Sequence, residues 1–80
     1  MDVRHQVGAN FRKMRIERGW SQEQAAEHTG VSQQYISGLE RGQRNPTVLT
    51  MFELAAPFGR EPRELLAPLA ETPYEAEQLR

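Results

Sequence analysis

Two neighbouring glutamines, Gln33 and Gln34, follow Ser32, a residue type that often begins a helix. A glutamine amide donates and accepts hydrogen bonds at once, which matches the N6 and N7 edge of adenine. A group of cationic and amide side chains that can contact phosphate follows shortly after: Arg41, Gln43, Arg44 and Asn45. Such residues are also ordinary on a solvated surface, so their meaning depends on the elements that position them.

The sequence offers few residues for other kinds of chemistry. The 80 residues contain no cysteine and two histidines, and the carboxylates are scattered without a nucleophile–base pair or a glycine-rich phosphate loop. We therefore expect no enzyme activity, no metal site and no cofactor. The chain also has no apolar run near the roughly 20 residues that span a bilayer, and its N-terminus lacks the apolar region of a signal peptide. This composition predicts a cytoplasmic protein that does not enter the membrane.

The formal charge of −1 is unevenly distributed. Residues 1–46 carry seven basic and five acidic side chains, whereas residues 47–80 carry three basic and six acidic ones. This asymmetry hints at an anionic partner for the first half, although a mixed solvated surface explains a small excess about as well. A chain of this length forms one small domain, whose stability depends on well-made helices or on association.

The apolar spacing predicts helices throughout. Positions 7, 11 and 14 form one stripe, which indicates a helix from about residue 3 to 17, ended by Gly19. Ser21 and Gln24 fit a capping box that begins a second helix at residues 22–28. Ser32 begins a third helix, which ends near Glu40, and Thr47 begins a fourth, which ends at or before residue 57.

The fourth helix is expected to bury Val48, Met51, Phe52 and Ala55, with Leu54 and Phe58 flanking them. Proline at position 62 fits the first turn of a short fifth helix that contains Leu65 and Leu66. Leu65, Leu66, Leu69 and Tyr74 are expected to be exposed and to cover a partner, with self-association as the favoured use of this surface. The predicted domain covers residues 1–67, and residues 68–80 are expected to form an acidic C-terminal tail that contacts a second copy or a partner protein.

Five short helices with tight connections predict an all-α fold. Residues 29–32 join the second and third helices by the short glycine-containing turn described for helix-turn-helix units. The chain here resembles the helix-turn-helix domains of the lambda Cro and repressor class, the Xre family. The resemblance covers roughly residues 7–66 without insertion and rests on these segments: Arg15, Gly19–Glu27, Gly30–Ser32, Ile36–Ser37, Glu40–Gly42, Arg44–Thr47, Leu54–Ala55 and Glu64–Leu66. Ala25 and Thr29 depart from the leucines usual in the family.

The resemblance implies a compact five-helix, lambda repressor-like domain in which the third helix enters the DNA major groove. Gln33 and Gln34 are then the predicted base readers, with Ser37 on the same helical face. Arg15 and Glu40 are predicted to form a structural ion pair, and Gln22 to brace Gln33. Predicted contacts to the DNA backbone come from Gln22, Ser32, Tyr35, Arg41, Gln43, Arg44, Asn45 and Arg12.

The glycine at position 38 stands where family members often carry a polar contact residue. It implies either a shorter footprint or a closer approach of the backbone to DNA. Tyr35 is equally open to a DNA contact and to packing on the second helix. Trp20 is expected to cover the junction of the first two helices, and His5 and His28 to be surface residues.

The predicted function is that of a bacterial transcriptional regulator, which binds double-stranded DNA in a sequence-specific manner. The regulator is expected to be a repressor that binds a two-fold site as a homodimer. Three alternatives stay open. One is an antitoxin-type regulator that also binds a partner protein through its C-terminal half. Another is a restriction–modification controller, and the third is a protein-interaction module without DNA binding.

Overall fold

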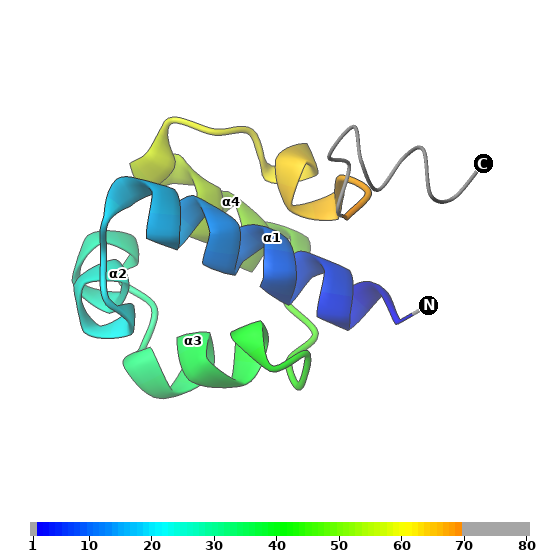
Figure 1. Cartoon of the computed structure of the whole chain (residues 1–80), viewed down its shortest axis with the longest axis horizontal. Helices are drawn as coiled ribbons and strands as arrows, with labels where there is room; N and C mark the ends of the chain where they lie inside the picture. Colours follow the sequence, from blue (N-terminus) through cyan, green and yellow to red (C-terminus); the bar gives the residue numbers. More distant parts are fainter. Residues whose placement is uncertain (1, 70–80) are drawn as a thin grey trace.

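The computed structural model describes residues 2–69, which form four α-helices and two short 3-10 helices, with no strand among them. The elements are α1 (Val3–Arg18), α2 (Gln22–Thr29), α3 (Gln33–Glu40), α4 (Val48–Ala55), η1 (Ala56–Phe58) and η2 (Pro62–Leu66). In Figure 1, α1 crosses the middle of the molecule between α3 and η2, and α2 lies at one end. The all-α prediction is confirmed, whereas the predicted fifth helix is the 3-10 helix η2.

The helix ends agree with the predicted capping residues. Ser21 accepts a hydrogen bond from the backbone N–H of Gln24 at 3.0 Å, and the Gln24 amide oxygen accepts one from the N–H of Ser21 at 2.8 Å. Ser32 and Thr47 begin α3 and α4 in the same way. Gly19 ends α1 with a φ of 78°, a left-handed conformation that glycine adopts without steric cost. Local chemistry therefore sets where each helix starts and stops.

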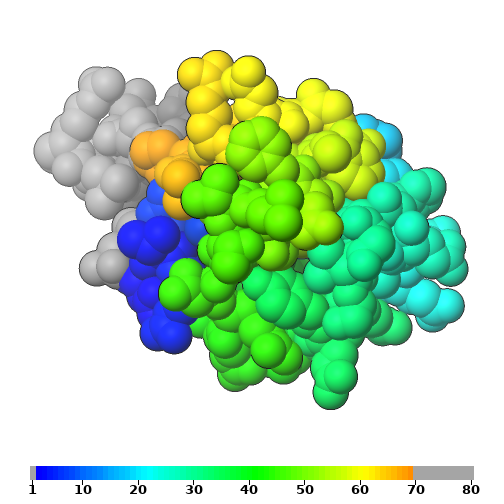
Figure 2. Space-filling view, turned by 180° about the vertical axis from the view of Figure 1, so that it is seen from behind, coloured from blue at the N-terminus to red at the C-terminus, as the bar shows by residue number. Residues whose placement is uncertain are grey.

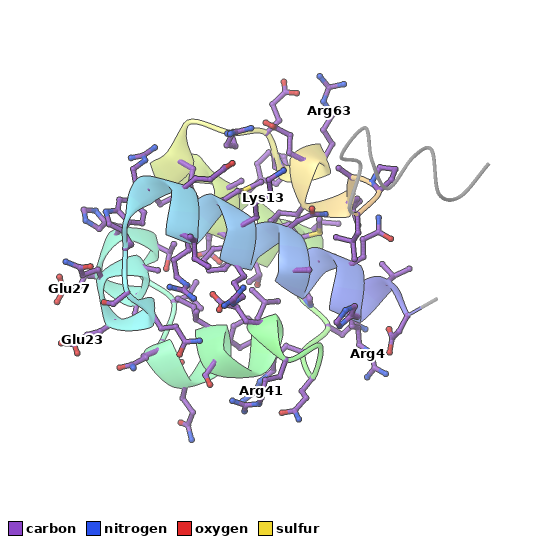
Figure 3. All side chains as sticks on the ribbon, viewed as in Figure 1. Arg4, Lys13, Glu23, Glu27, Arg41 and Arg63 are labelled. Atoms are coloured by element: carbon purple, nitrogen blue, oxygen red, sulfur yellow. The ribbon has the colours of Figure 1, made fainter. Side chains whose placement is uncertain are left out.

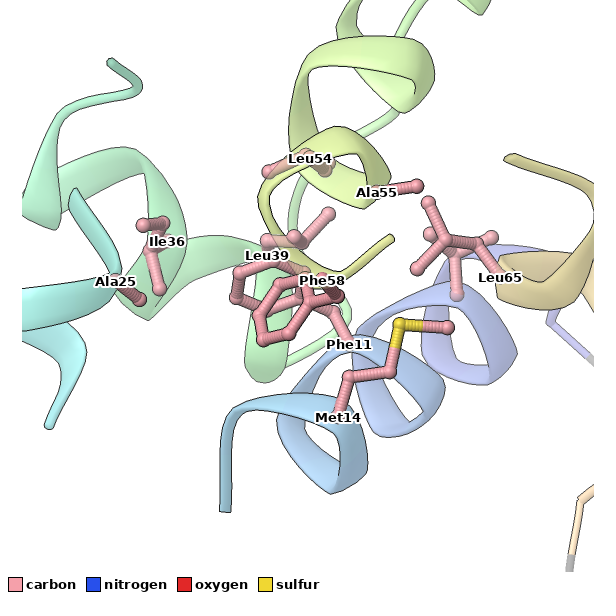
Figure 4. Packing of buried hydrophobic residues seen from close by; sticks show 10 residues of the cluster. Phe11, Met14, Ala25, Ile36, Leu39, Leu54, Ala55, Phe58 and Leu65 are labelled. Atoms are coloured by element: carbon pink, nitrogen blue, oxygen red, sulfur yellow. The ribbon is translucent and has the colours of Figure 1, made fainter. Parts of the chain in front are cut away.

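The core lies where α1, α3, α4 and η2 meet, as Figure 4 shows. Its largest fully buried side chains are Phe11, Ile36, Leu39, Leu54 and Leu65. Each buried side chain of this size stabilises the fold by about 1.5–3 kcal/mol relative to exposure. Because Ile36 and Leu39 belong to α3, the same burial that stabilises the domain also fixes which face of α3 points outward.

The predicted buried stripe of α4 is wrong at two positions. Val48 and Phe52 are 72% and 56% exposed, whereas Leu54 and Phe58, expected at the flank, are buried beside Ala55. Residues 51, 54, 55 and 58 share one face by helical spacing, and residues 48, 51, 52 and 55 share another. Both faces are apolar, so periodicity could not decide between them. The packing of η1 and η2 against α4 selects the first.

The two leucines of η2 point in opposite directions. Leu65 is fully buried, which corrects the expectation that it is exposed, and Leu66 is exposed. Two amides of α1 hold this segment. Buried Asn10 donates to the carbonyls of Leu65 at 2.9 Å and Ala67 at 2.8 Å, and Gln6 donates to Leu66 and Ala67. These bonds satisfy carbonyls that the short helix leaves free.

A charged cluster closes the start of η2. The carboxylate of Glu64 accepts from the backbone N–H of Glu61 at 2.9 Å and from Arg60 at 2.7 Å. Arg60 also lies 3.7 Å from a carboxylate oxygen of Glu17 on α1. The hydrogen bond from Glu61, followed by that from Arg60, holds the pKa of Glu64 below its usual value. Folding therefore favours the charged form of this carboxylate.

The crossing of α1 and α3 is a contact between backbones. A Cβ added at Gly8 would lie 3.0 Å from the carbonyl carbon of Leu39 and closer still to its oxygen. The absent side chain of Gly8 thus allows the end of α3 to rest directly on α1. This close approach positions α3, and the sequence analysis did not predict it.

Of the predicted tail at residues 68–80, only residues 68 and 69 are described; the expectation for Tyr74 lies outside the described residues. Within residues 2–69, no helix combines the length and the apolar character needed to cross a membrane.

Candidate nucleic-acid interface

The outward face of α3 carries the predicted base readers. Ile36 and Leu39 are buried on one side of the helix, and Gln33 and Gln34 are exposed at its first turn. Ser32 accepts a hydrogen bond from the backbone N–H of Tyr35 at 3.0 Å, which fixes the start of this turn. Two amides therefore stand at the exposed N-terminal end of a helix whose opposite side is held in the core.

The turn between α2 and α3 holds the two helices at a fixed angle. Ala25 of α2 and Ile36 of α3 are both fully buried, at the left of Figure 4. Thr29 donates to the carbonyl of Ala25 at 2.8 Å and accepts from the N–H of Val31 at 3.1 Å. The hydroxyl thus bonds to backbone groups of the turn. These bonds give a physical role to Thr29, one of the departures from the family pattern.

An ion pair ties α1 to the end of α3. Arg15 donates to both carboxylate oxygens of Glu40, at 2.7 and 2.9 Å, and to the carbonyl of Trp20 at 2.8 Å. The predicted Arg15–Glu40 pair is therefore confirmed. The Glu40 side chain is only 4% exposed, and hydrogen bonding to it raises the pKa of Arg15 further above its usual value. Arg15 thereby keeps a negative charge on α3 paired.

Gln22 begins α2 and shares this carboxylate. Its amide N–H donates to Glu40 at 3.2 Å, so in the structure its partner is Glu40 rather than the predicted Gln33. A glutamine amide has two N–H donors, and one of them is left for another acceptor. The contact of Gln22 with phosphate stays a prediction.

The end of α3 carries polar side chains that bond to one another. Arg41 donates to the hydroxyl of Ser37 and, at 3.2 Å, to the amide oxygen of Gln43. Figure 3 shows Arg41 projecting outward from this end of α3, whereas Glu23 and Glu27 project from α2 at the end of the molecule. The hydroxyl of Ser37 can still donate, because it is the acceptor in its bond to Arg41.

Arg44 and Tyr35 lie against each other beside Gly38. The guanidinium carbon of Arg44 is 5.2 Å from the centre of the Tyr35 ring, within the range of a cation–π interaction. Burial raises the pKa of the Tyr35 phenol, against the opposing effect of Arg44. The Tyr35 ring is partly buried and packs against the core, while the rest of the side chain stays accessible at the predicted interface.

The structure gathers most predicted DNA contacts on one surface, which we call the α3 surface. It consists of the start of α2, the outward side of α3 and the loop that follows: Gln22, Ser32, Gln33, Gln34, Tyr35, Ser37, Arg41, Gln43 and Arg44. Asn45 comes later in the loop and lines a hollow with Val3 of α1 and Met51 of α4. Arg12 lies on α1, one turn after Gly8 and one before Arg15, both of which contact α3. It is exposed at the border of this surface.

Two other predicted features lie elsewhere. Trp20 stacks on the exposed ring of His28, with the ring centres 4.0 Å apart, and its ring centre lies 5.0 Å from that of Phe58. Trp20 therefore packs at the junction of α1 and α2, as predicted.

Within residues 2–69, no three His, Cys, Asp or Glu side chains are grouped as metal ligands.

A second exposed surface is apolar, and of its residues only Leu66 was predicted to be exposed. Val48, Leu49, Phe52 and Leu66 are between 47% and 72% exposed, and we call them the α4 face. A groove of about 860 Å³ runs between α4 and η2, lined by Met51 and Phe52 and edged by Arg60, Glu61 and Arg63. Figure 2 shows α4 beside the segment that contains η2 on this side of the molecule. Contiguous exposed apolar side chains of this kind mark association surfaces.

Known proteins resemble this chain in sequence. The model of a helix-turn-helix family, HTH_3, matches residues 11–65. The chain is 51% identical over 74 residues to y4dJ, an HTH-type transcriptional regulator of Sinorhizobium fredii, and the match covers 92% of this chain and 96% of that protein.

Two crystal structures have the same fold. A hypothetical transcription factor from Neisseria, NHTF, aligns with 99% of this chain and 86% of its own, at a TM-score of 0.79 and 33% identity. The restriction-modification controller protein C.AhdI from Aeromonas hydrophila aligns with 78% of this chain and 94% of its own, at a TM-score of 0.73 and 39% identity.

Proposed function

The chain belongs to the helix-turn-helix family HTH_3, and from this we propose that it is a transcriptional regulator that binds a specific sequence in double-stranded DNA. The observation that carries the proposal is the pair of exposed amides, Gln33 and Gln34, at the N-terminal turn of a helix whose other side is buried. A helix enters the major groove by this end, where its first side chains meet base edges. The transcriptional regulator of Sinorhizobium fredii supports the same function.

We assign base recognition to the first half of α3. Gln33 and Gln34 pair with adenine through the amide, which offers a donor and an acceptor in one plane. Ser37 is one turn after Gln33 and donates its hydroxyl to a base, while Arg41 holds the oxygen from the other side. The Arg15–Glu40 pair keeps the end of α3 fixed while these contacts form.

Phosphate contacts surround the base readers. Gln22 uses its second amide N–H, next to the free backbone N–H groups at the start of α2. The other proposed contacts are Ser32, Tyr35, Arg41, Gln43, Arg44, Asn45 and Arg12. Cations at this rim release counterions from DNA, so binding should weaken as the salt concentration rises.

We propose that two chains bind one operator. A single recognition helix offers few base contacts, and two-fold dimers double them on a two-fold site. The α4 face supplies the contact, since Phe52 of one chain can enter the groove of the other. Charges of both signs edge this groove: Arg63 donates to the carboxylate of Glu61 in the same chain, and in a two-fold dimer the two copies can exchange these partners. We propose that this dimer acts in the cytoplasm as a repressor, by occupying a promoter.

Selection of bound duplexes from a random pool tests the proposed function, with the mass of the protein–DNA complex measured on the selected duplex. We expect one enriched sequence with two-fold related halves and a mass of two chains per duplex. Enrichment of no sequence by the folded protein would overturn DNA recognition and favour a protein-interaction module.

A charge placed on the α4 face tests the dimer. Phe52→Glu buries an unpaired charge in the proposed contact, so the variant should stay monomeric and bind the selected duplex more weakly. Ile16→Glu is the matched control, because Ile16 is 50% exposed on α1, away from the groove. Equal masses and equal affinities for both variants would contradict this interface.

A further inference from the structure

The side chain of Arg44 crosses α3 at the one position in that helix without a side chain. A Cβ added at Gly38 would lie 2.9 Å from Nε, 3.3 Å from Cγ and 3.6 Å from Cδ of Arg44. The aliphatic stem of Arg44 therefore occupies the space above Gly38, and Gly38 is buried beneath it. Arg44 takes the place of a side chain at position 38.

The backbone of the loop brings Arg44 back to the helix. The N–H of Gln43 donates to the carbonyl of Gly38 at 2.9 Å, and the N–H of Gly42 donates to the carbonyl of Leu39 at 2.9 Å. Gly42 has a φ of 76°, so the chain reverses after α3 in the manner of a Schellman ending. Arg44, two residues after Gly42, then lies beside the last turn of α3.

Gly38 lies on the same side of α3 as the predicted base readers. It is one turn after Gln34 and one turn after Tyr35, at the spacings that place side chains next to each other. A glycine inside a helix is costly in comparison with alanine. At this position the cost is offset by the room it leaves for the Arg44 side chain.

We infer that Arg44 reads a guanine in the major groove next to the base contacted by Gln34, with Gly38 providing the space and the Tyr35 ring holding the guanidinium. The inference rests on the proposed function and changes one part of it, because it moves Arg44 from the phosphate contacts to the base contacts and so gives it a role in sequence preference. A guanidinium offers two parallel donors that match O6 and N7 of guanine. Packing on the neutral Tyr35 ring keeps this planar group in one orientation.

Arg41 is the natural comparison for Arg44. It has the same charge and comes from the same end of α3, but its donors are bonded to Ser37 and Gln43 at the rim. The three atoms nearest to a Cβ at position 38 all belong to Arg44 and none to Arg41. We expect Arg41 to contact phosphate and Arg44 to contact a base.

The experiment measures affinities of the purified chain for the selected operator and for each single base-pair substitution of it. Arg44→Ala should lose discrimination at one G·C pair in each half-site, by about 5- to 150-fold. Arg41→Ala should weaken binding to all duplexes by a similar factor and keep the preference at every position. Each variant's helix content and thermal unfolding are measured alongside.

Gly38→Ala tests the same site without removing a charge. The three atoms nearest to the new methyl group all belong to the flexible side chain of Arg44, so the fold should be kept while the guanidinium is displaced. Preference should fall at the same G·C pair as in Arg44→Ala. The double variant should lose no more preference there than Arg44→Ala alone, since both changes act on one contact.

Three results would overturn the inference or a part of it. Uniform weakening by Arg44→Ala in a wild-type chain that is itself selective would leave the proposed function intact and make Arg44 a phosphate contact. If Gly38→Ala keeps the wild-type preference at that G·C pair, Gly38 does not contribute to base recognition, and this part of the inference is overturned. A wild-type chain without any preference would refute the proposed function itself, and with it this inference.

Discussion

Replacement of Gly8 by alanine tests how α3 is held. In the structure, α1 and α3 contact each other through their backbones. A Cβ at position 8 would lie 3.0 Å from the carbonyl carbon of Leu39 and 3.2 Å from Cα of Glu40. Neither atom can move as a side chain does. The new methyl group can fit only if the two helices separate at the point where the recognition helix ends.

The magnitude follows from two opposing contributions. Alanine favours a helix over glycine by about 1 kcal/mol. Overpacking against fixed atoms costs about 3 kcal/mol or more when the obstacle is backbone. Separation would also disturb the bond from the N–H of Gly42 to the carbonyl of Leu39, at 2.9 Å. We therefore expect Gly8→Ala to lower the free energy of unfolding by about 2 kcal/mol, and Tm by about 8–16 °C for a domain of this size.

Thermal and urea unfolding, followed by circular dichroism, measure this change, with Gly38→Ala as the matched control. Both substitutions add one methyl group inside a helix, but the three atoms nearest to the methyl group at position 38 all belong to the Arg44 side chain. The control should be as stable as the wild type or more so. If Gly8→Ala is as stable as Gly38→Ala, the backbone crossing does not constrain α3 and the reasoning is refuted.

Three further substitutions probe the contacts that hold the interface and η2. Asn10→Ala removes the donor to the carbonyls of Leu65 and Ala67 and should cost about 1–3 kcal/mol in urea unfolding; no loss would show that Asn10 does not hold η2 on α1. Arg15→Met leaves Glu40 buried without its cation and should cost about 3–5 kcal/mol, whereas a loss below about 1 kcal/mol would contradict the role of the pair. Glu64 has a lowered pKa in the folded chain, so its stabilisation is complete above pH 4.5 and is lost as the pH falls below that value. In Glu64→Gln, stability should depend less on pH in this range, and equal acid profiles would disprove the assignment.

Much of the fold could be predicted because local chemistry decides it. Ser21, Ser32 and Thr47 each begin a helix by accepting a hydrogen bond from a backbone N–H three residues later, so the helix starts could be predicted from residue type and spacing. The same holds for Gly19, whose left-handed conformation ends α1. These signals act over a few residues and need no knowledge of the packing.

The errors occur where contacts between distant segments decide. Leu65 and Leu66 are neighbours of the same type, and only the path of η2 along α1 determines which one is buried. In α4, two overlapping apolar faces were available, and the packing of η1 and η2 chose the one that leaves Phe52 exposed. An apolar pattern alone does not contain this information.

The candidate site shows the same division. The position of Gln33 and Gln34 on the exposed side of α3 follows from the spacing of Ile36 and Leu39, which are buried. The crossing of Arg44 over α3 depends on the reversal after the helix. A glycine inside a predicted helix was the available signal, and its meaning needed the path of the loop.

Base recognition by α3 is the central claim, and a comparison of specificity profiles tests it most directly. Affinities are measured for the selected operator and each of its single base-pair substitutions, for the wild type, Gln33→Ala and Gln34→Ala. We predict that each variant loses about 5- to 150-fold discrimination at an A·T pair in each half-site, at a different pair for each glutamine. Profiles identical to that of the wild type in both variants would contradict the account.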